Sequence, residues 1–159
     1  MSRTVSRPIG WWTALVGVGL AAVASPAAGS DAPLAEAVKH RDTAVVRVLL
    51  DQQVDVNASQ ADGATALHWA AYWNDTETVD LLVRAGADVD TVNDLGVTPL
   101  WLASTHGTQD DATLVTQLLR AGADPNVAHL SGESPLMAAA RTGRVQVVMA
   151  LLAGGADVN

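Results

Sequence analysis

The amino-acid sequence predicts an all-α solenoid, built from short helix-turn-helix units that stack side by side. One phrase recurs as RAGADVD at residues 84–90, RAGADPN at 120–126 and GGADVN at 154–159. A second phrase recurs with it, as GATALHWAA from Gly63, GVTPLWLAS from Gly96 and GESPLMAAA from Gly132. Gly63 to Gly96 is 33 residues and Gly96 to Gly132 is 36. Self-similarity at such a period is typical of stacked repeats.

Each unit carries the signals of a first helix. Leu67, Ala70 and Ala71 are spaced i, i+3 and i+4, which places them on one helical face. In the next two units TP at 98–99 and SP at 134–135 open the same segment. A Thr or Ser hydroxyl caps free N–H groups, and Pro in the first turn costs no hydrogen bond. These pairs are therefore predicted to start helices.

A second helix with its own apolar stripe is predicted after each first helix. In the unit from Gly63 the stripe is Val79, Leu82 and Val83. The corresponding stripes are Val46, Leu49 and Leu50, then Val115, Leu118 and Leu119, then Val148, Leu151 and Leu152. A glycine suited to a left-handed C-cap follows three of the stripes, at Gly86, Gly122 and Gly155. Helices this short are not stable alone, so each pair must bury its stripe against a neighbour.

These segments resemble ankyrin repeats, whose pattern joins G-x-T-P-L-H-x-A-A to a later L-L-x-x-G-A-D-x-N. The segments are DGATALHWAAYWNDTETVDLLVRAGADVD, LGVTPLWLASTHG with LLRAGADPN, and SGESPLMAAARTGRVQVVMALLAGGADVN. Departures from the pattern are Ala66 for Pro, Trp101 and Met137 for His, Ser104 for Ala, and Asn74 for Gly. The resemblance implies an ankyrin-repeat solenoid with projecting β-turn fingers, and a binding function.

The resemblance divides the chain into repeats at 31–60, 61–93, 94–129 and 130–159. The first repeat is degenerate, because it reads QQVDVN in place of the GAD phrase, and this suits an N-terminal cap. The third repeat holds a three-residue insertion, which we place in THGTQDD before its second helix. The fourth repeat ends on an ordinary apolar stripe instead of a polar cap, so we expect more sequence beyond Asn159 in the complete protein.

The N-terminus has the layout of a secretory signal. Arg3 and Arg7 precede an uncharged stretch from Ile9 to Ala24, and small residues follow it. We expect a signal peptide at 1–24, with cleavage near Ala24 or as late as residue 29. The apolar run is short for a membrane span, which needs about 20 residues, but an uncleaved anchor is the alternative. Both place the repeats outside the cytoplasm, in the periplasm or secreted, and high Ala with a single Lys favours a bacterial source.

Composition and charge limit the classes of function. The chain has a net charge of −8, and without residues 1–24 it has seven basic and seventeen acidic residues, a net charge of −10. Such a surface repels phosphate backbones, so nucleic acid is not expected as a partner. The absence of Cys excludes disulfides, thiolate catalysis and Cys-based zinc sites. Nothing in the sequence indicates a homo-oligomer.

His68 is the candidate general base, because Asp62 and Asp75 are close to it in the sequence. The ankyrin resemblance instead implies that this His forms local hydrogen bonds that brace neighbouring loops. Trp101 and Met137 replace it in the next two repeats, which argues against a catalytic base. We therefore expect a structural role for His68 and no catalytic residues.

Metal and cofactor sites are not expected either. His40 and His106 both end first helices, but they are two repeats and thus on the order of 20 Å apart, too far to share one zinc ion. Asp110 and Asp111 form a carboxylate pair that a calcium ion would suit, but an acidic helix start explains it better. The aspartates of the GAD phrase are expected to hold turns by accepting backbone N–H groups.

The resemblance directs attention to the ends of the first helices and to the fingers as the surface for another protein. The expected partner-binding residues are Tyr72, Trp73, His106, Arg141, Asp62, Asp94, Leu95, Val97 and Glu133. Tyr72 and Trp73 are the proposed anchors, because exposed aromatic side chains often dominate binding. Trp69 and Trp101 are expected to pack in the core.

The sequence thus predicts a non-catalytic interaction module, an adaptor or scaffold that acts outside the cytoplasm. One alternative is the recognition segment of a longer exported enzyme or redox protein whose active domain lies beyond residue 159. Another is a membrane-tethered scaffold that retains its N-terminal helix.

Overall fold

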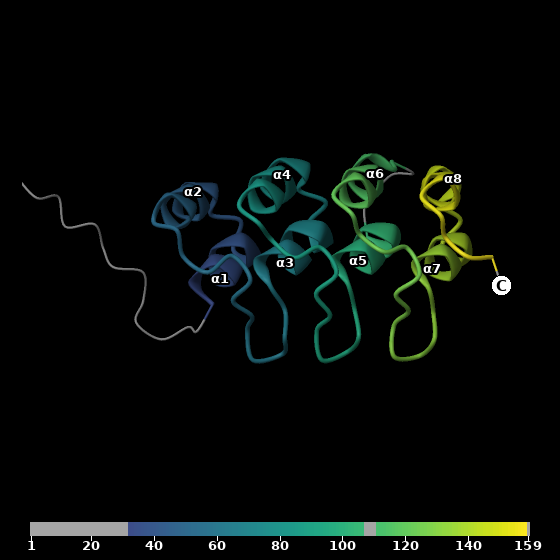
Figure 1. Ribbon diagram of the computed structural model, residues 1–159, viewed down its shortest axis with the longest axis horizontal. Helices are drawn as coiled ribbons and strands as arrows, with labels where there is room; N and C mark the ends of the chain where they lie inside the picture. Colours follow the sequence, from purple (N-terminus) through teal and green to yellow (C-terminus); the bar gives the residue numbers. More distant parts are fainter. Residues whose placement is uncertain (1–31, 107–110, 159) are drawn as a thin grey trace, which may run out of the picture.

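A computed structural model describes residues 32–106 and 111–158, and the predicted signal peptide at 1–24 lies outside the described residues. The described part is all-α. Its helices are α1 (Pro33–Lys39), α2 (Thr43–Asp51), α3 (Ala66–Tyr72), α4 (Thr76–Arg84), α5 (Pro99–Thr105), α6 (Thr113–Arg120), α7 (Pro135–Arg141) and α8 (Val145–Ala153). The odd-numbered helices form one row and the even-numbered helices a second row, with fingers projecting below the first row (Figure 1). The predicted solenoid of helix pairs is confirmed.

The first-row helices begin where the capping residues predict. Thr98 Oγ1 accepts a hydrogen bond from the N–H of Trp101 at 3.1 Å, directly before Pro99. Ser134 Oγ accepts from the N–H of Met137 at 3.2 Å. These side chains occupy N–H groups that have no partner within a helix. The sequence pairs TP and SP therefore fix the start of α5 and α7.

The second-row helices end in a left-handed glycine turn. Gly86 has a φ of 91°, its N–H bonds the carbonyl of Val83, and the next N–H bonds the carbonyl of Leu82. This is the Schellman arrangement, and it satisfies carbonyls that the helix itself leaves free. Gln53 takes the same place after α2 with a φ of 55°, which costs energy for a residue with a Cβ. The first helix pair therefore keeps the turn although it lacks the glycine.

The core runs along the stack between the two rows. Val79 and Leu82 of α4 are fully buried, and so are the equivalent Val115 and Leu118 of α6. In the last pair Leu151 is buried but Leu152 is 44 % exposed, because in the described part of the chain no further helix pair covers α7 and α8. The stripes of the inner pairs are thus buried by their neighbours, as short helices require.

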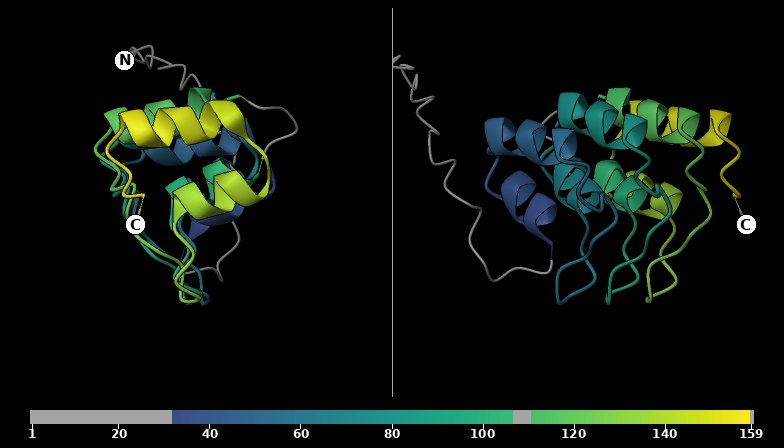
Figure 2. Two further views of the ribbon diagram at one scale, coloured as in Figure 1. Left: turned by 90° about the vertical axis from the view of Figure 1, so that its right-hand side faces the viewer. Right: turned by 60° about the vertical axis from the view of Figure 1, so that its left-hand side comes forward.

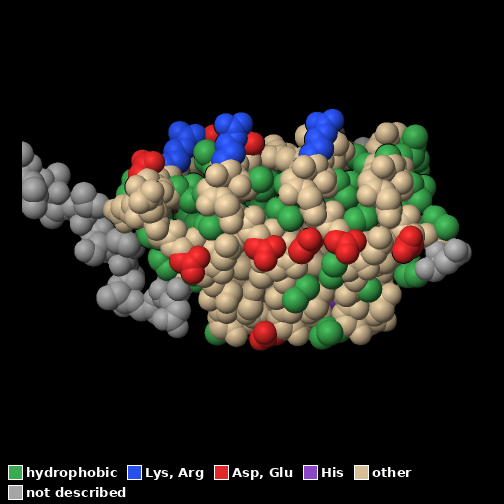
Figure 3. Space-filling model, in the orientation of Figure 1, with side chains coloured by type: hydrophobic (Ala, Val, Ile, Leu, Met, Phe, Trp, Pro, Cys, Tyr) green, Lys and Arg blue, Asp and Glu red, His purple; other side chains and the backbone are tan. Residues whose placement is uncertain are grey.

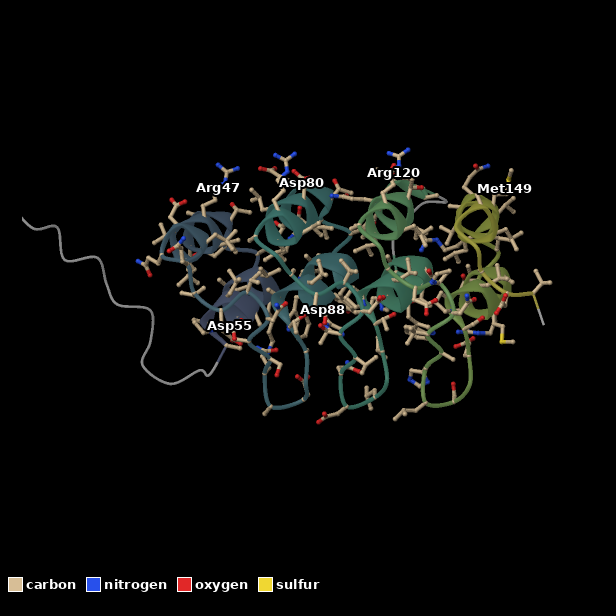
Figure 4. The ribbon with its side chains drawn as sticks, viewed as in Figure 1. Arg47, Asp55, Asp80, Asp88, Arg120 and Met149 are labelled. Carbon is tan, nitrogen blue, oxygen red and sulfur yellow. The ribbon has the colours of Figure 1, made fainter. Side chains whose placement is uncertain are left out.

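Side chains of the turns after the second-row helices connect successive pairs. Asn57 Oδ1 accepts from the N–H of Asp88 at 2.8 Å, and Asn57 Nδ2 donates to the carbonyl of Gly86 at 3.3 Å. Asn126 makes the same two bonds to Asp157 and Gly155, and Asp90 accepts from the N–H of Asp124. Acidic side chains of this face form a row in Figure 3, and Figure 4 labels Asp55 and Asp88. Each turn is therefore fastened to the next.

The aspartates of the GAD phrase hold their own turns, as expected. Asp88 Oδ1 accepts from the N–H of Asp90 at 3.0 Å. Asp124 Oδ1 accepts from the N–H of Asn126 at 2.9 Å. These carboxylates are engaged in turn structure, where Asp commonly mimics a backbone acceptor.

The fingers pack against one another. Within a finger, the N–H of Asn93 bonds the carbonyl of Val97 at 3.1 Å, and between fingers the N–H of Asp94 bonds the carbonyl of Asp62 at 3.0 Å. Gly96 has a φ of 74°, and a Cβ there would lie 2.7 Å from the Leu130 side chain of the next finger. The close spacing seen in Figure 2 thus depends on a residue without a side chain.

The connection between α5 and α6 is held by a buried arginine. It spans residues 106–112, whereas 73–75 join α3 to α4 and 142–144 join α7 to α8. Arg144 Nη1 donates to the carbonyls of Ala103 at 2.8 Å and His106 at 2.6 Å, and Nη2 to that of Asp111 at 3.4 Å. The guanidinium group therefore forms hydrogen bonds with both ends of the longer connection.

Asp111 starts α6. Its Oδ1 accepts from both the N–H and the hydroxyl of Thr113, at 2.9 and 2.6 Å, and these bonds lower the pKa of the carboxyl group. Asp110 lies outside the described residues. The geometry at Asp111 is that of an acidic helix start.

Candidate protein-binding surface

The end of α3 presents an aromatic cluster, which we define as Trp69, Tyr72, Trp73 and His106. Tyr72 lies edge-on to both tryptophans, with ring centroids 6.0 Å from Trp69 and 4.8 Å from Trp73. His106, at the end of α5, places its ring 4.6 Å from that of Tyr72. The cluster thus joins two helix pairs, and it contains three of the predicted partner-binding residues, Tyr72, Trp73 and His106.

Tyr72 and Trp73 are exposed and well supported. Tyr72 is 38 % and Trp73 40 % exposed, although each packs against another ring. Trp69 is half-buried, not fully in the core, and its Nε1 donates to Gln60 Oε1 at 2.8 Å. Rings held in this way lose little conformational freedom when a partner covers them, as binding anchors require.

Two cations of the first helix pair lie over the cluster. Lys39 Nζ is 5.2 Å from the ring centroid of Trp69, and Arg41 Cζ is 5.7 Å from that of Trp73. These are cation–π distances. The tryptophan faces therefore already attract positive charge within the protein.

A cavity of about 150 Å³ opens beside the cluster. It lies between α3, α5 and their fingers. Its lining residues are Asp62, Ala64, His68, Trp69, Tyr72, Asn93 and Leu102. Asp62 Oδ1 accepts from the N–H of Ala64 at 3.0 Å, which holds this carboxylate at the cavity.

His68 is buried at the base of the cavity and is fully engaged. The N–H of Thr65 donates to Nδ1 at 3.2 Å, so Nε2 carries the proton and donates to the carbonyl of Val97 at 2.9 Å. Burial lowers the pKa of His68, although the bond to Val97 and the charge of Asp62 oppose this shift. A neutral histidine with both nitrogens occupied braces the next finger, which is the predicted structural role.

The stability of the fold should therefore depend on the protonation of His68. Because its folded-state pKa lies below the ordinary value of 6.5, the unfolded chain binds the proton more readily. Its contribution is complete at pH values above 6.5 and is lost as the pH falls below 6.5 toward the lowered pKa. Urea unfolding at pH 7.5 and 5.5 should show this loss, and a His68→Gln variant should show a smaller pH difference. Equal differences would contradict the assignment.

Val97 corrects one expectation for the binding surface. Its side chain is only 5 % exposed, so it cannot contribute to a partner surface. Its carbonyl binds His68 Nε2, and this bond turns the residue inward beneath the finger. Leu95, in contrast, is 63 % exposed, and Asp94 beside it is also exposed, as the prediction requires.

Arg141 and Glu133 form a separate pair in the α7–α8 unit. Arg141 Nε donates to Glu133 Oε1 at 2.8 Å. This bond lowers the pKa of Glu133 and raises that of Arg141. The two side chains form an ion pair with each other at the base of the last finger, apart from the aromatic cluster. A partner would therefore meet charges that are already paired.

Trp101 and the remaining histidines have local contacts. Trp101 is half-buried where the sequence predicted core, and it stacks on His129 at 5.3 Å between ring centroids. His40 is exposed and lies 2.8 Å from Glu36. In residues 32–106 and 111–158 no group of three or more His, Asp and Glu side chains is placed to hold a metal ion. None of the helices in those ranges is long and apolar enough to cross a membrane.

The second-row helices carry three of the six described arginines, Arg47, Arg84 and Arg120. Arg47 Nη2 lies 2.6 Å from Glu77 Oε1, and Arg84 Nε lies 3.0 Å from Asp80 Oδ2. Figure 4 labels Arg47 and Arg120 along this edge, and Figure 3 shows Lys and Arg side chains gathered there, away from the fingers. These arginines thus lie on a different face from the cavity with Asp62, whereas Lys39 and Arg41 lie at the aromatic cluster.

A family model described as ankyrin repeats, in three copies, matches residues 22–93 and 100–159. The chain belongs to the ankyrin-repeat family. Ankyrin repeats generally act as non-catalytic modules that bind other proteins, and the exposed aromatic cluster fits that use.

Curated relatives match over part of these repeats. The chain is 36 % identical over 74 residues to potassium channel AKT1 of Oryza sativa subsp. indica, covering 46 % of this chain and 8 % of the channel. It is 43 % identical over 61 residues to B-cell lymphoma 3 protein of Homo sapiens, covering 36 % and 13 %. It is 41 % identical over 56 residues to protein phosphatase 1 regulatory subunit 12A of Mus musculus, covering 35 % and 5 %. The match thus spans a small part of each relative.

Proposed function

We propose that this chain is a non-catalytic ankyrin-repeat adaptor or scaffold that binds another protein through its aromatic cluster. The observation that carries the proposal is the pair Tyr72 and Trp73. Both side chains stay exposed to solvent although their rings pack against each other. His106 extends the cluster to the next helix pair, so a bound segment would lie across two repeats. Leu95 and Asp94 are exposed on the adjacent finger, whose Asn93 lines the cavity beside the cluster.

Substitution of the two anchors tests this function. The full chain with Tyr72→Ala and Trp73→Ala should lose capture of its partner by about tenfold or more, because truncation of an aromatic hot spot costs about 2 kcal/mol. Tagged protein returned to extracts of its source, followed by mass spectrometry, measures the capture.

The matched control is Met149→Ala. Met149 is also an exposed large apolar residue, but it lies on α8 in the second row, away from the cluster (Figure 4). It should leave capture unchanged. Unchanged capture by the Tyr72 and Trp73 variants, with circular dichroism that shows intact helices, would rule out the cluster as the binding surface.

We further propose that the module acts outside the cytoplasm, in the periplasm or after secretion. The basic, then apolar, then small-residue order of residues 1–24 supports export. The mass of the exported protein separates the two forms of this proposal: a first residue near 25–29 indicates cleavage, and retention of Met1 in a membrane fraction indicates a tethered scaffold.

A further inference from the structure

The cavity beside the aromatic cluster has the size of a single side chain. Its volume is about 150 Å³. Sites for small-molecule ligands occupy about 300–1,000 Å³, whereas one water in the liquid takes about 30 Å³. The cavity is therefore too small for a typical metabolite and large enough for one long side chain of a bound protein.

The lining of this cavity combines aromatic rings with one carboxylate. Trp69 and Tyr72 provide the rings, and Asp62 provides the negative charge. No Lys or Arg is among the lining residues. A ring face and an unneutralised carboxylate both attract a cation, and the attraction strengthens where water is partly excluded.

The remaining polar groups of the cavity do not supply a competing charge. His68 is buried with both ring nitrogens engaged, and its pKa is lowered, so it is neutral at neutral pH. Asn93 uses its Oδ1 to accept from the N–H groups of Leu95 and Val97 within its finger. Asp62 thus supplies the one carboxylate among the lining residues, and no Lys or Arg of the lining opposes it.

The protein itself shows that these rings take cations. Lys39 lies over Trp69 and Arg41 over Trp73, and both approach from the α1–α2 pair. The cavity adjoins Trp69 together with Asn93 and Leu102, which belong to the finger and helix of the α5–α6 pair. A second cation can therefore approach from that side while the intramolecular one stays in place.

Building on the function proposed above, we propose that the cavity receives a Lys or Arg side chain from a basic segment of the partner protein. The charged end pairs with Asp62, and the aliphatic stem packs against Trp69 and Tyr72 where they line the cavity. The net charge of −8 favours the approach of such a segment over an acidic one. The aromatic cluster then supplies the apolar contacts, and the cavity selects for positive charge.

Two small probes test the cavity without the natural partner. Nα-acetyl-lysine methylamide carries the cation, and Nα-acetyl-norleucine methylamide has the same stem without it. Each is titrated to millimolar concentrations into the ¹⁵N-labelled full chain, and chemical shifts are followed. The lysine probe should shift the Trp69 indole N–H and the amides of Asp62 and Tyr72 in a saturable manner. The norleucine probe should shift them at least about fivefold less, because it lacks the ammonium group that pairs with Asp62 and is attracted by the ring faces.

A matched pair of charge variants isolates Asp62. Asp62→Asn keeps an Oδ1 acceptor for the N–H of Ala64 and should weaken lysine-probe binding about threefold, as removal of a partly solvated ion pair does. Asp51→Asn makes the same change on an exposed side chain at the end of α2, outside the cavity lining, and should leave binding unchanged. Equal shifts with norleucine, equal weakening by both variants, or shifts spread along the turns with Asp55 and Asp88 would each overturn the proposal.

The cavity and the wider function fail in different ways. If the lysine probe causes no saturable shifts but Trp73→Ala still abolishes capture, the cation site is wrong and the adaptor function stands. If the probe binds at the cavity and the Tyr72 and Trp73 variants still capture the partner, the cavity stands and the proposed binding surface is wrong.

Discussion

Leu82→Ala is expected to lower the free energy of unfolding by about 2 to 5 kcal/mol, the range for truncation of a buried leucine. Leu82 is fully buried in α4, one of the inner helix pairs. Each helix pair of a repeat protein is stabilised largely by its neighbours. The void left by the truncated leucine therefore weakens the interfaces on both sides of α4. Urea unfolding followed by circular dichroism measures the loss.

The control for Leu82 is a leucine of the same row with little burial. Leu152 of α8 is 44 % exposed, and its truncation should cost less than about 1 kcal/mol, because little apolar area is lost. Similar losses for both variants would mean that α4 is not packed between its neighbours as described.

Arg144→Ala is expected to cost about 3 kcal/mol, since a charged donor to several carbonyls is lost and the acceptors remain partly buried. Arg144 is 7 % exposed and donates to Ala103, His106 and Asp111, at both ends of the connection between α5 and α6. For a chain of this size the melting temperature should fall by roughly 10 °C. Differential scanning calorimetry measures this shift.

Two further substitutions separate geometry from charge. Arg144→Lys keeps the positive charge but not the planar set of donors, so it should recover only part of the lost stability. Arg141→Ala removes an exposed arginine whose partner is Glu133, and it should lower the melting temperature far less. A melting temperature for Arg144→Ala that matches that of Arg141→Ala would contradict the role of the buried guanidinium.

The fold was predictable because the repeat period of the sequence and the capping residues of each helix indicate the same helix pairs. Thr98 and Ser134 cap helices where the TP and SP pairs predicted, and Gly86 closes α4 in the left-handed conformation. These are local effects, in which one or two residues determine a hydrogen bond within the same turn. His68 was also predictable, since the resemblance named its bracing role.

The site was predictable in part. Tyr72, Trp73 and His106 meet in one cluster, but Val97 is buried, because its orientation depends on a bond from His68 in the preceding pair. Arg144 was missed entirely. The available signal was that Arg144 directly precedes α8, whereas Asp42 and Asp75 directly precede α2 and α4 and cap them. A hydrogen-bond donor at a position where other repeats have an acceptor indicates that this side chain bonds a different group. Only the structure shows that the group is a set of backbone carbonyls.

The side-chain bonds between successive turns make the repeats interchangeable parts. Asn57, Asp90 and Asn126 contact only main-chain N–H and C=O groups of the following turn. Nearly every residue carries those groups, so a duplicated unit of 33 residues finds matching partners at any seam of the stack. Duplication or deletion of a unit can therefore lengthen or shorten this protein while these hydrogen bonds between turns are kept. The recognition residues stay on the unit that carries them.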